Sequence, residues 1–277
     1  RLRNAGFKVG FHMMPGQPGM SKEMCLQDFR ELFENADWRP DYLKIYPTLV
    51  VRDTVTYDMW RQGEYDPLTN EEAADLVAEI KSMIPRYTRL QRVQRDIPAD
   101  FIDAGVWKSN LRQLARQRMD KHGWTCECIR CREVGMNDAD PDGTELDVHT
   151  YEAAGGTEHF VSIEDFESDL LVGFCRLRFP GDPADGTAES LRSELEDAAV
   201  VRELHVYGSE VAVGDAGGED HQHQGYGRRL LAEAERLAAE AGFGKLSVIS
   251  GIGAREYYRE KLGYYQDGPY VSTRLDR

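Results

Sequence analysis

Residues 221–246, HQHQGYGRRLLAEAERLAAEAGFGKL, place Gly225 and Gly227 two positions apart at the start of a helical pattern. Backbone N–H groups at a helix start are unpaired and carry partial positive charge, so together they can bind a phosphate. Glycine lets a ligand approach the backbone, and Arg228 and Arg229 add charge in the first turn. The stretch lacks the third glycine and the preceding first strand of a dinucleotide fingerprint. It predicts either a phosphate-binding loop or a glycine-rich turn into an ordinary amphipathic helix.

The segments around this helix predict the order of elements in the C-terminal half. LDVHTYEA, EHFVSIED, LLVGFCRLRF and AVVRELHVYG alternate like antiparallel strands, and KLSVISG, a short helix GAREYYREKLG and a final strand pair follow the helix. This order resembles the Gcn5-related N-acetyltransferase (GNAT) fold. The resemblance implies that acetyl-CoA binds through its pyrophosphate at the glycine loop and through its pantetheine arm along the preceding strand. The implied cofactor residues are Glu203, Leu204, His205, Val206, Gln222, Gln224, Gly225, Tyr226, Gly227, Arg228, Arg229 and Tyr258.

Two adjacent tyrosines, Tyr257 and Tyr258, lie in the short helix near the end of the chain. Acetyltransferases of this fold use a tyrosine there to protonate the departing thiolate. A tyrosine hydroxyl has a pKa of about 10 and can donate its proton without prior ionisation. Neighbours on a helix point about 100° apart, so only one is expected to face the cofactor. We favour Tyr258; the alternative is that both rings only pack in the core.

The N-terminal half predicts strands alternating with helices. FKVGFHM (7–13) is expected to be a buried strand, and DYLKIYP and YTRLQRVQ are the next two strands. Helices are expected between them, capped by Ser21 and Thr69, and a further helix capped by Ser109 follows. Strand–helix–strand units of this length predict a parallel sheet, here the tail of a larger α/β barrel that begins before residue 1.

Three of the five cysteines lie within CECIRC, at Cys126, Cys128 and Cys131. An odd count with tight clustering predicts a reducing, cytoplasmic setting and a metal site rather than disulfides. Three thiolates suit Zn²⁺, and the fourth ligand is left open between His122, His149 and a group from elsewhere. Cys25 and Cys175 are expected to be buried packing residues.

Charge is divided unevenly along the chain, whose net charge is −15. Residues 1–135 carry 21 basic and 20 acidic side chains, against 13 and 29 in residues 136–277. The strongest positive region spans residues 86–132 and predicts either phosphate binding or a solvated face of internal ion pairs. The candidate RNA-binding residues are Arg86, Arg89, Arg92, Arg95, Lys108, Arg112, Arg116 and Lys121, with Arg118 beside them. No run of about 18 apolar residues predicts a membrane span.

Several phrases together resemble one family, the catalytic subunits of Elongator. They are HMMPGQPGM, DYLKIYPTLV, VQRDIPADFI, SNLRQLA, CIRCREVG, VRELHVYGS, HQHQGYG and AREYYREKLGY, in this order over nearly the whole chain. The resemblance implies a radical-SAM barrel joined by a zinc-binding linker to a GNAT domain. It implies that acetyl-CoA and S-adenosyl-L-methionine (SAM) serve to make carboxymethyluridine at tRNA position 34, with tRNA-stimulated acetyl-CoA hydrolysis.

One departure concerns the [4Fe–4S] cluster of that family. Its Cys-x4-Cys-x2-Cys motif is absent here, so this chain is expected to bind no cluster itself, and in the full-length protein the motif would precede residue 1. The expected domains are 1–107 (C-terminal part of the barrel), 108–136 (basic helix and zinc-binding linker) and 137–277 (acetyltransferase). Expected partners are tRNA and acetyl-CoA, with other Elongator-type subunits or a second copy left open.

Two other functions fit parts of the sequence. A protein lysine or small-amine N-acetyltransferase would need a general base, and Glu203 is the candidate. A non-catalytic RNA-binding module would not need Gly225, Gly227 or Tyr258, and all three are present.

Overall fold

The computed structural model describes residues 1–137, 141–181, 192–207 and 225–276. The chain forms two compact units, Gly10–Cys131 and a second made of Arg1–Val9 together with Arg132–Arg277. The predicted boundary at residue 107 and the assignment of residues 1–9 to the barrel differ from this division. Residues 1–9 group with the C-terminal unit because buried polar contacts tie them to its sheet.

The unit Gly10–Cys131 contains a three-stranded parallel sheet in the order β1-β2-β3, as predicted. The strands are β1 (Gly10–Met13), β2 (Tyr42–Ile45) and β3 (Arg89–Arg92). The helices are α1 (Lys22–Glu34), α2 (Val55–Gln62), α3 (Asn70–Ser82), α4 (Leu111–His122) and, at the boundary between the units, α5 (Ile129–Arg132). The expectation of a buried first strand is wrong, because β1 lies at an edge of the described sheet and is half-exposed.

Two of the three predicted helix caps are confirmed. The Ser21 side chain accepts a hydrogen bond from the Met24 amide, and Thr69 and Glu72 form a capping box. Ser109 does not cap α4: the cap position is Asn110, without a side-chain cap bond. Lys108, two residues before the cap position, donates its backbone amide to the Asn70 side chain, which fixes the approach to the helix.

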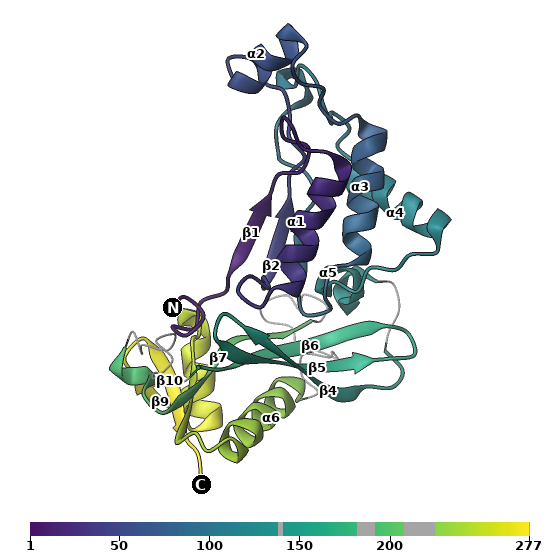
Figure 1. The fold of residues 1–277 in the computed structure, drawn as a ribbon. Helices are drawn as coiled ribbons and strands as arrows, with labels where there is room; N and C mark the ends of the chain where they lie inside the picture. Colours follow the sequence, from purple (N-terminus) through teal and green to yellow (C-terminus); the bar gives the residue numbers. More distant parts are fainter. Residues whose placement is uncertain (138–140, 182–191, 208–224, 277) are drawn as a thin grey trace. The chain divides into compact units, whose positions relative to one another are not determined.

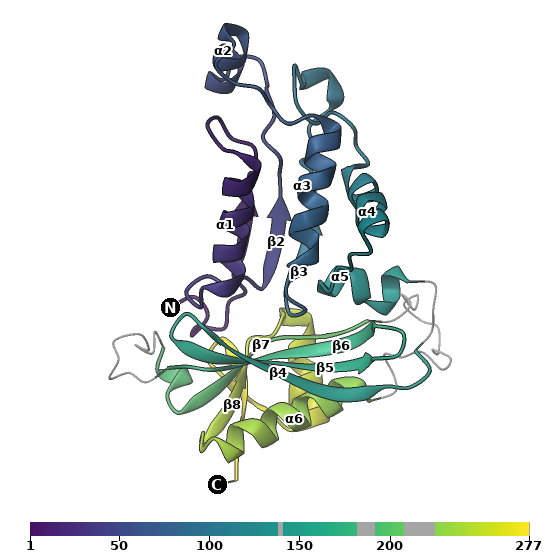
Figure 2. The same cartoon turned by 45° about the vertical axis from the view of Figure 1, so that its right-hand side comes forward.

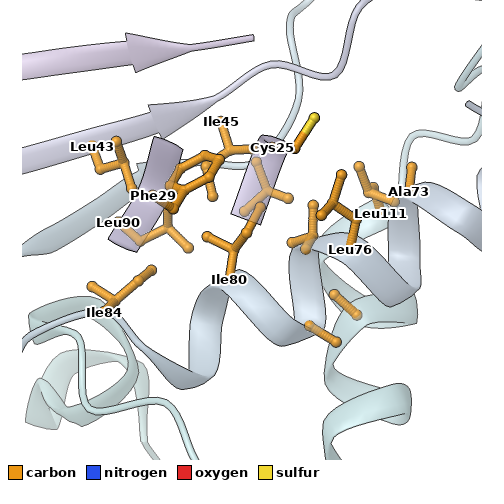
Figure 3. Packing of buried hydrophobic residues seen from close by; sticks show 14 of the residues in the cluster. Cys25, Phe29, Leu43, Ile45, Ala73, Leu76, Ile80, Ile84, Leu90 and Leu111 are labelled. Carbon is orange, nitrogen blue, oxygen red and sulfur yellow. The ribbon is translucent and has the colours of Figure 1, made fainter. Parts of the chain in front are cut away.

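Apolar side chains of α1 and α3 pack on the strands of this unit. Figure 3 shows Phe29 and Ile80 lying against Leu43, Ile45 and Leu90, all of them buried. Cys25 belongs to this core, as expected of a packing residue. Both helices run alongside β2 in Figure 1.

The C-terminal unit is built on a seven-stranded sheet in the order β4-β5-β6-β7-β8-β10-β9. The strands are β4 (Glu145–Ala153), β5 (Gly156–Asp165), β6 (Leu170–Phe179), β7 (Ala198–Val206), β8 (Lys245–Val248), β9 (Tyr265–Asp267) and β10 (Tyr270–Arg274). The predicted antiparallel run of β4 to β7 is confirmed, and β7 pairs with β8 in parallel after the helical crossover.

Helix α6 (Tyr226–Glu240) lies against one face of this sheet (Figure 2). Its side chains Leu230, Leu231 and Ala234 pack with Val201 of β7 and Val248 of β8. Alternation along a strand sends the neighbouring residues to the opposite face. None of the helices described combines the length and apolar character that crossing a membrane requires.

Candidate acetyl-CoA site, metal site and basic surface

Strands β7 and β8 part at the centre of the C-terminal unit. Their parallel pairing runs from Ala198 with Lys245 to Val201 with Val248, and β7 continues beyond it to Val206. A cavity of about 410 Å³ lies where they separate. It is lined by Gly6, Phe7, Lys8, Arg202, Glu203, Leu204, His205, Ile249, Ser250, Gly251, Ala254 and Tyr258.

Tyr258 and Tyr257 differ sharply in their surroundings. Tyr258 is 5% exposed and lines the cavity, whereas Tyr257 is 42% exposed. Both lie in a π-helical turn, Tyr257–Lys261. Burial raises the pKa of Tyr258, and its hydroxyl has no hydrogen-bond partner among the described residues. A buried phenol that stays protonated and has no partner is free to donate to a bound ligand.

The start of α6 presents an open glycine turn. Gly225 has a left-handed backbone with φ 77° and serves as a cap without a side-chain bond. A Cβ on Gly227 would lie 3.9 Å from Val206 and 4.0 Å from the Tyr257 hydroxyl, so space remains above the first turn. A helix of 15 residues then presents unpaired N–H groups to this space.

The arginines of this turn are less available than the sequence suggested. Arg228 donates to the Lys261 carbonyl at 3.0 Å, and the Arg229 guanidinium lies over the Tyr226 ring. Gln222 and Gln224 lie outside the described residues.

The residues predicted to bind the pantetheine arm lie in β7, and their side chains point to both faces of the sheet. Leu204 and Val206 pack towards the core beneath α6, and the His205 ring lies against Phe174. Glu203 forms ion pairs with two basic side chains: its carboxylate accepts hydrogen bonds from the Arg176 Nε at 2.9 Å and from the Lys8 Nζ at 2.8 Å. Burial alone would raise the pKa of Glu203, but the charges of Arg176 and Lys8 outweigh it and lower that pKa.

The thiols of Cys126, Cys128 and Cys131 converge, with all three sulfur atoms within 4.8 Å of one another. Hydrogen bonds from the other two thiols, helped by the charges of Lys81 and Arg112, lower the pKa of Cys131. Three converging soft donors, of which Cys128 is buried and the other two are partly buried, fit a thiophilic divalent metal.

The fourth position of this site has no protein ligand within the described residues. No histidine or carboxylate joins the three thiols in that part of the chain. The His122 ring stacks on Trp124 with centroids 4.4 Å apart, and His149 belongs to β4 of the other unit.

A second cavity, of about 490 Å³, follows the carboxyl end of β3. Arg92, Arg95, Arg112 and Trp107 line it. The Arg95 guanidinium lies 5.8 Å from the centroid of the Tyr46 ring, beside the carboxyl end of β2. Cations and aromatic rings together are the groups that bind nucleotides and single-stranded RNA.

The basic side chains separate into exposed and structural ones. Arg95, Arg116 and Lys121 are exposed and make no ion pair with the described residues. Lys108 and Arg118 pair with Glu71, while Arg86 and Arg89 are half-buried. Arg92 pairs with Asp96.

Arg112 is half-buried, and its predicted contact with RNA stays a prediction. It donates to the carbonyls of Leu90 and Gln91, and burial lowers its pKa. It therefore holds α4 to β3 besides lining the cavity.

Sequence reasoning missed Lys8 and Arg176. Lys8 is 195 residues from its partner Glu203 in the sequence. Arg176 lies in a mostly apolar strand, and the alternation of residues along that strand does not indicate which side chain Arg176 binds. The only available signal was the pair of arginines at 176 and 178 in a strand otherwise apolar.

Comparisons with known proteins agree with this geometry. The Radical_SAM C-terminal domain model matches residues 40–121, and the Acetyltransferase (GNAT) family model matches residues 128–264. A tRNA uridine(34) acetyltransferase of Methanocaldococcus jannaschii is 47% identical over 99% of this chain and 51% of its own length. Elongator complex protein 3 of Saccharomyces cerevisiae is 46% identical over 99% of this chain and 49% of its own length.

A solved structure shares the fold over the whole chain. The archaeal Methanocaldococcus infernus Elp3 with an N-terminal deletion (1–46) superposes with a TM-score of 0.89 at 46% identity, covering 99% of this chain and 65% of that one. The chain spans about half the length of the curated relatives it matches.

Proposed function

The chain belongs to the family of Elongator catalytic subunits and tRNA uridine(34) acetyltransferases, and we propose that it is part of an enzyme that uses acetyl-CoA to modify the wobble uridine of tRNA. The observation that carries this proposal is the cavity where β7 and β8 part. The buried side chain of Tyr258 lines this cavity, and the open glycine turn at the start of α6 lies in the same unit.

Each part of this unit has a task towards acetyl-CoA. The N–H groups of the first turn of α6, at Gly227 and beyond, bind the pyrophosphate. The backbone of β7 at Glu203–Val206 pairs with the amides of the pantetheine arm, as a strand edge pairs with an added strand. The thioester then reaches the cavity and Tyr258.

Transfer of the acetyl group breaks the bond between the carbonyl carbon and sulfur. When an acceptor such as water attacks that carbon, the sulfur leaves with the electron pair as a thiolate. Tyr258 donates its proton to that thiolate, and the resulting phenolate regains a proton from solvent. The phenol is neutral at pH 7 even at its ordinary pKa of about 10, so it holds the proton that it donates, and burial raises that pKa further.

SAM and a [4Fe–4S] cluster would supply the radical chemistry of such an enzyme. The five cysteines of this chain do not contain the cluster spacing, so this chain's residues do not hold that group. Zn²⁺ fits Cys126, Cys128 and Cys131, and we assign it a structural role because three thiols converge on one point, Cys128 being buried and the other two partly buried.

The exposed cations Arg95, Arg116 and Lys121, with the cavity after β3, support tRNA as the partner. The five cysteines form no disulfide, which supports a reducing, cytoplasmic setting, and further Elongator-type subunits are proposed as partners from the family alone.

The amine acetyltransferase alternative is less well supported. It requires Glu203 as a general base, yet that carboxylate is held by Arg176 and Lys8 and its pKa is lowered. A base of lowered pKa accepts a proton from an ammonium acceptor poorly.

The deciding experiment measures CoA release from acetyl-CoA by the full-length protein, with and without tRNA and with a lysine peptide. We expect release to rise with tRNA and to be unchanged by the peptide. Acetylation of the peptide without any effect of tRNA would refute the proposal in favour of the amine acetyltransferase.

A further inference from the structure

Helix α3 has a buried lysine in its last turn. The buried side chains of this helix include Ala74, Val77, Ala78 and then Lys81. These residues are three or four positions apart, so they lie on one face of the helix, and Lys81 is the charged member of an apolar row. Only 3% of Lys81 is exposed. A buried ammonium group is costly unless an opposite charge or hydrogen-bond acceptors compensate it.

No carboxylate of the described residues forms an ion pair with Lys81. The four acidic side chains of α3 itself are all engaged elsewhere. Within the part of the chain that the structure describes, the compensating charge therefore has to come from a group other than a carboxylate. The other partners on α3 are Arg118 for Glu71 and Asp75, Lys22 for Glu79, and the Thr69 cap for Glu72.

The three thiols lie at the same end of α3 as this lysine. Cys128 belongs to the core cluster that contains Ile80 and Ile84, two residues labelled in Figure 3. The Ile129 amide donates to the Thr88 carbonyl at 3.1 Å, which fastens the cysteine loop to the segment that follows the helix. The last turn of α3 and the cysteine loop are thus neighbours within one unit.

Two cations lie near the converging sulfur atoms. The charges of Lys81 and Arg112 both act on Cys131. Arg112 also donates to the carbonyls of Leu90 and Gln91, so it holds α4 to β3 as well. The Lys81 side chain makes no such hydrogen bond with the described residues, which leaves the sulfur atoms as the source of its compensation.

We propose that Lys81 is the charge-compensating cation of the metal site, and that its ammonium group raises the affinity of Cys126, Cys128 and Cys131 for a divalent metal. Three thiolates around Zn²⁺ leave one net negative charge, which a neighbouring ammonium group offsets in a buried setting. The inference rests on the proposed zinc site, because the three thiols need not carry that charge without a metal. Replacing a group that supports metal ligands in this way lowers metal affinity by about 10- to 100-fold.

The test measures the zinc dissociation constant of the full-length protein by competition with a chromogenic chelator, and its melting temperature with and without zinc. Lys81→Met keeps an unbranched apolar side chain and removes the charge, whereas Lys81→Arg keeps the charge. Lys22→Met is the matched control, because Lys22 is an exposed cation that pairs with Glu79 of the same helix at 2.7 Å.

We expect Lys81→Met to weaken zinc binding by about 10- to 100-fold, Lys81→Arg to recover most of that loss, and Lys22→Met to stay within about threefold of the wild type. Without zinc, Lys81→Met should melt no lower than the wild type, because an apolar chain replaces a buried charge whose partner is absent.

A lysine that only supports the fold would give a different pattern. Lys81→Met would then lower both melting temperatures and leave the zinc dissociation constant unchanged, which would overturn the inference while the zinc site stands. An equal loss of zinc affinity in Lys81→Arg and Lys81→Met would assign the effect to packing and would overturn it too. Absence of zinc binding by the wild type would refute both the inference and the proposed zinc site.

Discussion

Tyr258→Phe separates chemistry from packing at the proposed acetyl-CoA site. The ring is 5% exposed and lies 5.7 Å, between centroids, from each of Tyr257 and Tyr264. Phenylalanine keeps these ring contacts. The Tyr258 hydroxyl has no partner among the described residues, so no hydrogen bond is lost, and we expect the free energy of unfolding to change by less than about 0.5 kcal/mol.

Turnover should respond far more strongly than stability. General acid help contributes about 10²-fold or more, which corresponds to about 2.7 kcal/mol of transition-state free energy. The affinity for acetyl-CoA should change less than turnover, because the ground-state thioester needs no proton. Tyr257→Phe is the control and should be mild, since that ring is 42% exposed.

The dependence on pH supplies a second check on Tyr258. Burial raises its pKa above the unfolded value of 10, so the folded protein keeps this proton at pH values where the unfolded chain loses it. Its contribution to stability is therefore fully present below pH 10 and is lost as the pH rises further. Acetyl-CoA hydrolysis should not fall between pH 7 and 9 through ionisation of this group. Near-normal turnover of Tyr258→Phe with tRNA present would show that the proton donor lies elsewhere.

Three other changes test the remaining sites. Cys128→Ser should remove about one equivalent of zinc and lower the melting temperature, measured by elemental analysis and thermal unfolding, because metal binding is coupled to folding; reduced wild type without zinc would contradict the site. Gly227→Asp places a carboxylate at the proposed pyrophosphate position and should abolish acetyl-CoA binding by calorimetry while circular dichroism stays unchanged; retained affinity would move the cofactor elsewhere. Arg116→Glu with Lys121→Glu should weaken tRNA binding and flatten its salt dependence in a filter-binding series; an unchanged slope would make this face an ordinary solvated surface.

Local sequence patterns predicted most of the elements because their causes are local. The Ser21 and Thr69 caps act within three residues, and the alternation of residue types along β4 to β7 is the local pattern of strands. Burial does not follow that alternation in β5 and β6, which are buried along nearly their whole length. The cysteine cluster was equally predictable, since six residues of chain are enough to bring three sulfur atoms together. The choice of Tyr258 over Tyr257 as the proton donor stays a prediction; Tyr258 is the more buried of the two rings.

The position of residues 1–9 could not be predicted in this way. FKVGFHM has the apolar pattern of a single strand, yet only Gly10–Met13 is strand. Phe7 and Lys8 are not part of β1 and bond instead to the C-terminal unit. The Phe7 carbonyl accepts from Arg202 and Lys8 donates to Glu203, each partner being 195 residues away in the sequence. No pattern within a window of ordinary length contains such contacts.

The role of Glu203 depends on the same long-range contacts, and it decides between two chemistries. Read alone, a glutamate on the cofactor strand is a suitable general base for an amine acceptor. Two cations within 3 Å change that reading, because they stabilise the carboxylate and oppose its protonation. A water acceptor has no ammonium group to deprotonate, so a paired Glu203 is compatible with hydrolysis of acetyl-CoA. The ion pairs that fasten residues 1–9 to the sheet thus also weigh against amine acetylation.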